Sequence, residues 1–270
     1  MFGINTLLNT PLAINKDYLL SVIPSLLMEY SLLKSQNFTR HMMEEVYMEN
    51  INAQSSGNSG IKSPVVVDIR GPIVKYTSWN GVGTQFYGQL LKSLDQNPRV
   101  SGIVLNIDSG GGMVSGTAEL TSIIKGLSKP TISYTAGYQC SAAQDIASGC
   151  QYHMASPHAD LLGSIGVMLS YQDFSAMFEK WGAHIYELYA PQSTEKNKEW
   201  RDLMSGDEVA YTERLKVLAN NFISRMKENF GEKLKDDGLV FKGKTYTPQE
   251  AKAIGLVDEI GSLEDALNKF

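Results

Sequence analysis

Beyond residue 63 the hydrophobic residues follow two alternating patterns along the chain. Continuous β-branched runs, PVVVDIR, SGIVLNID and PTISYT, are typical of strands that are buried on both faces. Between them, residues 84–97 and 115–128 place apolar side chains every three to four positions, which predicts helices. Further along we expect a strand at 163–172 and a helix at 174–183. The alternation predicts βαβ units around a mostly parallel sheet, which is an α/β fold.

The first part of the chain has a different pattern, and three regions follow from it. Residues 1–51 are expected to form a helical extension, and residues 52–63, NAQSSGNSGIKS, a flexible linker. Residues 64–270 form the main domain. The extension carries an apolar stripe at helical spacing, formed by Leu19, Ile23, Leu26, Tyr30 and Leu33. We interpret such a helix as packing on the core or on another subunit rather than on a membrane.

Composition and charge limit the classes of partner. The 270-residue chain is 43% hydrophobic and 20% charged, as soluble proteins are, and its net charge of −5 argues against nucleic acid or an anionic membrane. The two cysteines form no disulfide framework, and no CxxC or HExxH spacing indicates a metal site. No basic leader or long apolar span is recognisable, so we expect a soluble, cytoplasmic protein.

Two strand ends carry the candidate chemistry. The loop 108–112, DSGGG, follows one predicted strand, and Ser141 follows another, just before a short predicted helix. In a parallel sheet both lie at the carboxyl edge, where ligands bind. The loop lacks the residues of nucleotide-binding fingerprints, because Ser115 and Thr117 stand where these need Gly and Lys. It is either a tight turn or a source of exposed amides, and Ser141 is either a helix cap or a nucleophile.

The order of several motifs resembles one family. GPIVKY, GIVLNIDSGGGMVSGTAEL, GYQCSAAQDIAS, LLGSIGVM and GKTYTPQEAKAIGLVDEIGS follow one another as in the signal peptide peptidase A-like serine peptidases, over about residues 64–262. The sequence is especially similar to the phage and prophage branch that processes capsid proteins. The resemblance implies the Clp protease/crotonase-like spiral fold with a mostly parallel sheet. It also implies assembly into homo-oligomeric rings or domes and a Ser–Lys catalytic dyad.

The resemblance assigns roles to single residues. Ser141 falls on the nucleophile, and the amides of Gly111 and Ala142 fall on the oxyanion hole, with Gly110 and Gly112 beside the substrate. Two departures are visible, because Gly110 replaces the usual proline and alanine rather than glycine follows the nucleophile. Both changes keep the backbone amides on which the assignment depends.

The resemblance also indicates the base. The position that holds a histidine in the Clp proteases is Ser164 here, and His158 lies in a nearby polar turn. A lysine is therefore expected, from the loop PQSTEKNKEW that follows a predicted strand at 183–190. We favour Lys196 over Lys198, with Ser164 orienting the lysine. An amine acts as a base near neutrality only when burial lowers its pKa well below about 10.4.

These features together predict a serine endopeptidase that needs no cofactor. Phage capsid or scaffold precursors are the expected substrates, and a cellular signal-peptide or membrane-protein peptidase is the alternative. Two hypotheses of another class stay open, a crotonase-like acyl-CoA enzyme and an inactive structural ring protein. Acyl-CoA binding would identify the first, and covalent labelling of Ser141 would exclude the second.

Overall fold

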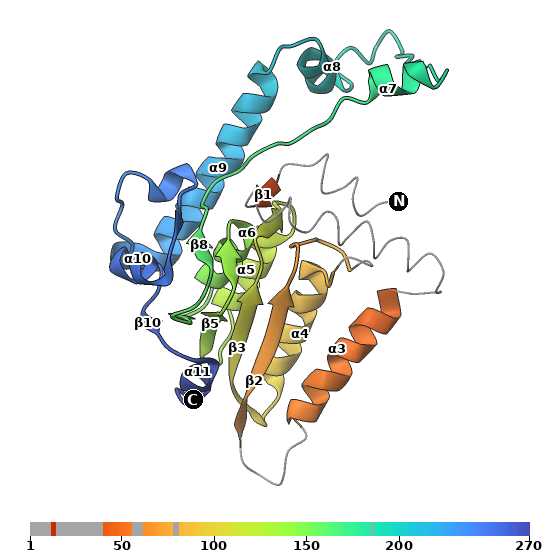
Figure 1. The fold of residues 1–270 in the computed structure, drawn as a ribbon. Coiled ribbons are helices and arrows are strands. Elements are labelled where there is room, and N and C mark those ends of the chain that lie inside the picture. Colours follow the sequence, from red (N-terminus) through yellow and green to blue (C-terminus); the bar gives the residue numbers. More distant parts are fainter. Residues whose placement is uncertain (1–11, 15–39, 56–61, 78–80, 185) are drawn as a thin grey trace.

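Five parallel strands form the central sheet, in the order β10-β7-β5-β3-β2 (Figure 1). The computed structural model describes residues 12–14, 40–55, 62–77, 81–184 and 186–270. The strands of this sheet are β2 (Ser63–Arg70), β3 (Val100–Asp108), β5 (Thr131–Thr135), β7 (Tyr152–Ala155) and β10 (Glu259–Ile260). The prediction of an α/β fold with a mostly parallel sheet is confirmed.

Side chains alternate along β3 between two apolar layers. Ile103 and Leu105 face the main core, whereas Val104 faces a smaller cluster on the other side of the sheet. The helices that contribute to the main core include α3 (Arg40–Ser55), α4 (Thr84–Gln96), α5 (Thr117–Lys125) and α6 (Ala142–Ser148). Helix α11 (Leu263–Leu267) covers the other side. The sheet is thus buried on both faces, as its continuous apolar strands require.

A second sheet holds the segment before Ser141. It consists of β6 (Tyr138–Cys140), β8 (Leu161–Gly163) and β9 (Thr245–Tyr246), with β6 parallel and β9 antiparallel to β8. The two sheets join where β3 ends. The Ser109 amide donates to the Tyr138 carbonyl at 2.7 Å, and the Cys140 amide donates to the Ser109 carbonyl at 3.1 Å. The glycine loop and the nucleophile candidate are therefore fixed relative to each other.

A third, two-stranded pairing lies at the glycine loop. Strand β4 (Gly111–Met113) pairs antiparallel with β1 (Leu12–Ile14), so a segment from the first residues of the chain lies against the site. The apolar stripe predicted at residues 19–33 falls outside the described residues. Helix α3 packs on β2, where the Gln54 side chain bonds both backbone groups of Val66. This helix continues to Ser55, so the predicted linker at 52–63 begins with helical residues.

A long arm leaves the body after β8 and returns as α9 (Figure 1). It carries α7 (Ser175–Lys180) and α8 (Lys198–Met204) and leads into α9 (Val209–Phe230), which packs on α6. The strand predicted at 163–172 is wrong beyond Gly163, because Ser164 takes a positive φ of 53° and ends the strand. The strand predicted at 183–190 is also wrong for the described residues, whose side chains are mostly exposed and lack a partner strand.

The C-terminal part closes the second sheet and the smaller core. The remaining elements are the 3-10 turns η1 (Gly231–Lys233) and η2 (Val240–Lys242) and helix α10 (Pro248–Ala253). A capping box at Thr247 and Glu250 starts α10. Among the helices of the described ranges, none combines the length and apolarity that crossing a membrane requires.

Candidate active site

Ser141 sits at a strained junction between β6 and α6. Its φ of 57° and ψ of −118° lie in a region that non-glycine residues rarely adopt. Hydrogen bonds hold it there: its amide donates to the Gly163 carbonyl at 2.7 Å, and its carbonyl accepts from the Asp145 amide at 2.9 Å. Because such strain persists only where the surroundings enforce it, this geometry points to a functional role.

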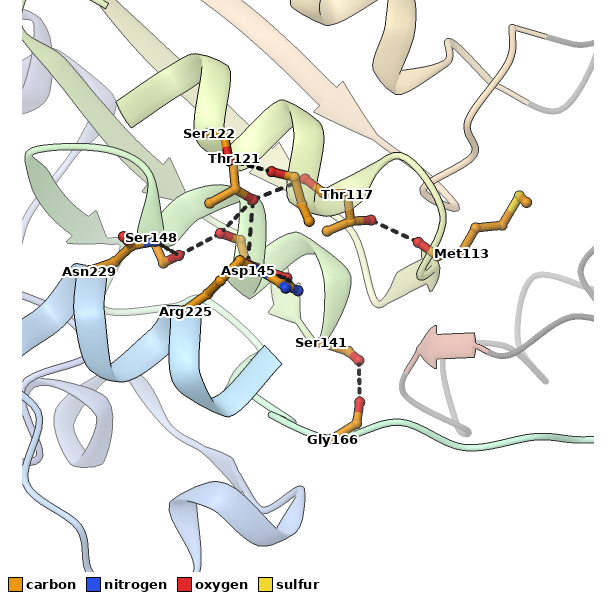
Figure 2. A network of polar contacts seen from close by, with 11 residues as sticks. Met113, Thr117, Thr121, Ser122, Ser141, Asp145, Ser148, Gly166, Arg225 and Asn229 are labelled. Carbon is orange, nitrogen blue, oxygen red and sulfur yellow. Dashed lines mark hydrogen bonds and ion pairs between the residues drawn. The ribbon is translucent and has the colours of Figure 1, made fainter. Parts of the chain in front are cut away.

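The Ser141 side chain does not cap the helix that it precedes. Its hydroxyl makes no bond to the amides of the first turn and instead donates a long contact of 3.4 Å to the Gly166 carbonyl (Figure 2). The interpretation of Ser141 as an ordinary helix cap is therefore wrong. The residue is 1% exposed, and Ala142 and Ala143 behind it are fully buried. Their small side chains let α6 pack closely under the nucleophile candidate.

The two predicted oxyanion-hole amides differ in their hydrogen bonding. Ala142 is the first residue of α6, where amides have no partner within the helix. The Gly111 amide is engaged, because it donates to the Ser109 hydroxyl at 3.1 Å. Gly111 also has a φ of 105°, which glycine adopts without strain. A substrate carbonyl would therefore have to displace the Ser109 hydroxyl before it could use the second amide.

Gly112 sits where no side chain fits. A Cβ at this position would lie 2.1 Å from the Ile73 carbonyl oxygen. The Ile73 amide donates to the Gly111 carbonyl at 2.9 Å, and the Ile73 carbonyl accepts from the Met113 amide at 2.8 Å. Gly110 is buried in the same loop. Glycine at position 112 therefore permits the Ile73 backbone to approach closely.

A buried ion pair anchors α6 from behind. Arg225 on α9 donates to the Asp145 carboxylate, with 2.6 Å between Nη2 and Oδ2, and the Thr121 hydroxyl donates to the Asp145 carbonyl at 3.1 Å (Figure 2). The Asn229 side chain donates to the Ser148 hydroxyl at 2.9 Å. Burial raises the pKa of Asp145 although the Arg225 charge opposes this. The sequence carries no motif for this pair, and the available signal was that Asp145 is the one charged residue of α6.

Ser164 lies next to Ser141 across the second sheet. Cys140 pairs with Gly163 in the parallel register of β6 and β8, so the residues that follow them, Ser141 and Ser164, come out side by side at the ends of neighbouring strands. The Ser164 amide donates to the Lys244 carbonyl at 2.8 Å, which fixes its position. This placement suits the orienting role that the resemblance implies.

The two candidate lysines lie on the exposed arm. Asn197 turns the chain in the left-handed conformation and Lys198 starts α8, where its ammonium group pairs with Asp202 at 2.6 Å. The hydrogen bond to Asp202 raises the pKa of Lys198, which keeps it protonated. Lys196 is exposed, and within the described part of the chain no contact joins either lysine to Ser141. The structure therefore does not assemble the predicted dyad within this copy of the chain.

The other nucleophile and base candidates lie in unsuitable surroundings. Cys140 is buried, its thiol donates to the Leu161 carbonyl at 3.3 Å, and burial raises its pKa to about 12. His158 is exposed in its turn. His153 is buried beside Ser133 on the central sheet, and burial lowers its pKa to about 4. In the described ranges no group of His, Cys, Asp and Glu side chains could hold a metal ion.

Comparisons with known proteins agree with this geometry. The model of peptidase family S49 matches residues 124–270. The chain is 26% identical to the provisionally named protease MJ0651 of Methanocaldococcus jannaschii over 69% of this chain and 60% of that protein. It is 27% identical to the capsid assembly protease C of Escherichia phage lambda over 73% of this chain and 44% of that protein. The chain thus spans about half the length of these relatives.

A solved structure supports the fold. A serine-to-alanine mutant of the 1510-N membrane-bound stomatin-specific protease matches 78% of this chain and 86% of that one, with a TM-score of 0.50 and 18% identity. At this identity the likeness concerns the fold alone. Together with the parallel sheet and its helices, it confirms the Clp protease/crotonase-like fold that the sequence motifs implied.

Proposed function

Because the chain belongs to peptidase family S49, we propose that it is a serine endopeptidase whose nucleophile is Ser141. The observation that carries the proposal is the strained backbone of Ser141 at the start of a helix, directly after Cys140, whose amide bonds Ser109 in the glycine loop. A hydroxyl in this place meets the free amides and the positive end of the α6 dipole, which favour developing negative charge.

The proposed reaction proceeds through an acyl-enzyme. The Ser141 hydroxyl attacks the peptide carbonyl carbon and passes its proton to a lysine, which returns the proton to the leaving amine. The Ala142 amide donates to the oxyanion, and the Gly111 amide joins it once the bond to Ser109 opens. Water then hydrolyses the ester. The bond from Gly111 to Ser109 predicts that the resting site is only partly prepared for this step.

The proposal assigns the base to Lys196. Lys198 is held by Asp202 in the first turn of α8, whereas Lys196 has no such carboxylate partner among the ion pairs of the described residues. Lys196→Ala should abolish activity, and Lys198→Ala, the matched control two residues away, should leave most of it. Loss of activity in Lys198→Ala with an active Lys196→Ala would move the role to Lys198. Activity in both variants would refute the dyad.

Assembly into a homo-oligomer is part of the proposal. The arm that carries Lys196 exposes large apolar side chains, and Leu188 is 97% exposed. Trp181 and Tyr186 on the same arm are also exposed. Exposed apolar groups of this kind indicate an interaction surface. Burying the arm against another copy would remove these groups from water and bring a lysine into surroundings that lower an amine's pKa.

Covalent labelling tests the central claim. A fluorophosphonate should label Ser141 in the wild-type protein and not in Ser141→Ala, with the site read by peptide mass spectrometry. A label elsewhere, or none, would refute the proposal. The test separates a peptidase from an inactive ring protein. Binding of acyl-CoA without labelling would instead support the crotonase-like alternative.

We further propose phage capsid or scaffold precursors as the substrates. The similarity to the capsid assembly protease of phage lambda supports this role. Relatives from cellular organisms are equally similar, so a membrane-protein or signal-peptide substrate is the second candidate. Incubating the protein with purified capsid precursor and, separately, with signal peptides decides between them. Specific cleavage of the precursor supports the viral role, and cleavage of signal peptides alone overturns it.

A further inference from the structure

We propose that the segment Leu12–Ile14 occupies the substrate position of its own site and that Ser141 cleaves the chain after Ile14. The inference rests on the proposed function, and it adds a defined substrate, which is the protein itself. The observation behind it is the antiparallel pairing of β1 with β4, the strand that starts at the glycine loop.

The edge of β4 that β1 uses is one that a peptide substrate would use. Ile73 occupies the opposite edge, where it bonds the Gly111 carbonyl and the Met113 amide. Because backbone groups alternate sides along a strand, the amide and carbonyl of Gly112 point to the other edge, where Ala13 is its partner. An extended segment that adds to a free strand edge in this way is a common mode of peptide recognition.

The direction of β1 determines which bond reaches the nucleophile. Leu12 pairs with Met113 and Ile14 with Gly111, so the segment runs towards the glycine turn. This turn continues into Ser109, whose carbonyl accepts from the Cys140 amide directly before Ser141. The arrow of β1 in Figure 2 points towards the side on which Ser141 lies. Of the three paired residues, Ile14 is the one that lies opposite Gly111, the residue whose amide is a proposed oxyanion donor.

Burial agrees with an occupied site. Ser141 is 1% exposed, and Gly111 and Gly112 are also buried while β1 lies on β4. An external substrate needs the same strand edge and the same hydroxyl. The segment must therefore leave, or be cleaved, before another peptide can bind.

The cleavage step balances as an ordinary hydrolysis. The Ser141 oxygen bonds the Ile14 carbonyl carbon, and the bond from that carbon to the nitrogen of residue 15 breaks. The new amine takes the proton that Ser141 lost. Water then releases the Ile14 carboxylate and restores the hydroxyl. The products are a peptide of residues 1–14 and a chain that begins at Asn15.

Intact mass and N-terminal sequencing of the full-length protein test the inference. The wild-type chain should begin at Asn15 after incubation, whereas Ser141→Ala, prepared identically, should retain residues 1–14. A wild-type chain that retains residues 1–14 while fluorophosphonate labels Ser141 overturns the inference and leaves the proposed function standing. Absence of both labelling and cleavage refutes both. Cleavage at another bond overturns the assignment to Ile14.

A pair of variants at Ala13 tests the pairing itself. Ala13→Pro removes the amide that faces Gly112, so it should slow the cleavage at least tenfold and raise the rate of fluorophosphonate labelling before cleavage. Ala13→Ser keeps the amide and should be processed as the wild type is. Equal processing of the two variants would show that the strand pairing has no part in the reaction and would overturn the inference.

Discussion

Replacing Arg225 by methionine should destabilise the helix that carries Ser141. The guanidinium group is the cationic partner of the Asp145 carboxylate, with 2.6 Å between the closest atoms, and Asp145 is 2% exposed. Methionine fills much of the same space without a charge. The nearest other donor to the carboxylate is the Thr121 hydroxyl, 3.4 Å from Oδ1, and its single proton is directed to the Asp145 carbonyl at 3.1 Å. A buried charge without a partner is costly.

Removing one partner of a buried ion pair costs about 3–5 kcal/mol. We expect the lower end, about 3 kcal/mol, because the Arg225 side chain is 25% exposed and water can reach the space that it leaves. In a domain of this size, each kcal/mol lowers Tm by about 2–4 °C. The expected decrease in Tm is therefore roughly 6–12 °C.

The stability that Arg225→Met loses should increase as the pH rises. Burial already raises the pKa of Asp145 in the folded protein, and removal of the Arg225 charge raises it further. The folded state then binds a proton more tightly than the unfolded state does. Folding stability consequently falls as the pH rises through the folded-state pKa and recovers as the pH is lowered. The free energy of unfolding of Arg225→Met should therefore lie closer to that of the wild type at pH 5 than at pH 7.5.

Urea unfolding at both pH values measures these differences. Arg214→Met is the matched control on the same helix, because its ion pair with Glu199 is exposed and should cost less than about 1 kcal/mol. Adding Asp145→Asn to Arg225→Met should recover most of the loss, since no charge is then buried alone. Equal effects of Arg225→Met and Arg214→Met, or no recovery in the double variant, would refute the reasoning.

Three further predictions concern single residues. Cys140 should react slowly with iodoacetamide in the native protein at pH 8, since burial raises its pKa to about 12; fast native labelling, followed by mass spectrometry, would contradict this. Gly112→Ala should lose roughly 1–3 kcal/mol in urea unfolding because of the clash with Ile73, whereas Gly126→Ala, which has room for a methyl group, should not. His153, whose pKa burial lowers to about 4, binds protons more weakly in the folded state, so stability should fall between about pH 6.5 and 4, and His153→Gln should reduce that fall.

The hydrophobic pattern of the sequence correctly predicted the central strands, because these are buried along most of their length. The run from Val100 to Asp108 is buried almost throughout, and its continuous apolar side chains are sufficient to identify a central strand. The position of Ser141 at the carboxyl edge followed from the order of strands and helices. The strand expected at 163–172 failed because the positive φ of Ser164 ends β8, and the run that follows adds no strand to the described sheets.

Other features depend on residues that are distant in the sequence. Asp145 and Arg225 are separated by 80 positions, and neither carries a local sign of its partner. The pairing of Leu12–Ile14 with the glycine loop involves three residues without a periodic pattern. The relation of Lys196 to Ser141 depends on where the arm lies, and in the proposed homo-oligomer that position would be set by contacts with another copy of the chain.

The strands that complete the site come late in the order of synthesis. Strand β9 (Thr245–Tyr246) pairs with β8 beside Gly163, and β10 (Glu259–Ile260) adds to β7 at the edge of the central sheet. A ribosome makes Ser141 well before it makes these strands, and domains fold as units once their parts are available. A nascent chain therefore carries the nucleophile without the sheet that holds Gly163 and Ser164 beside it. Translation itself would delay activity until the whole domain has emerged.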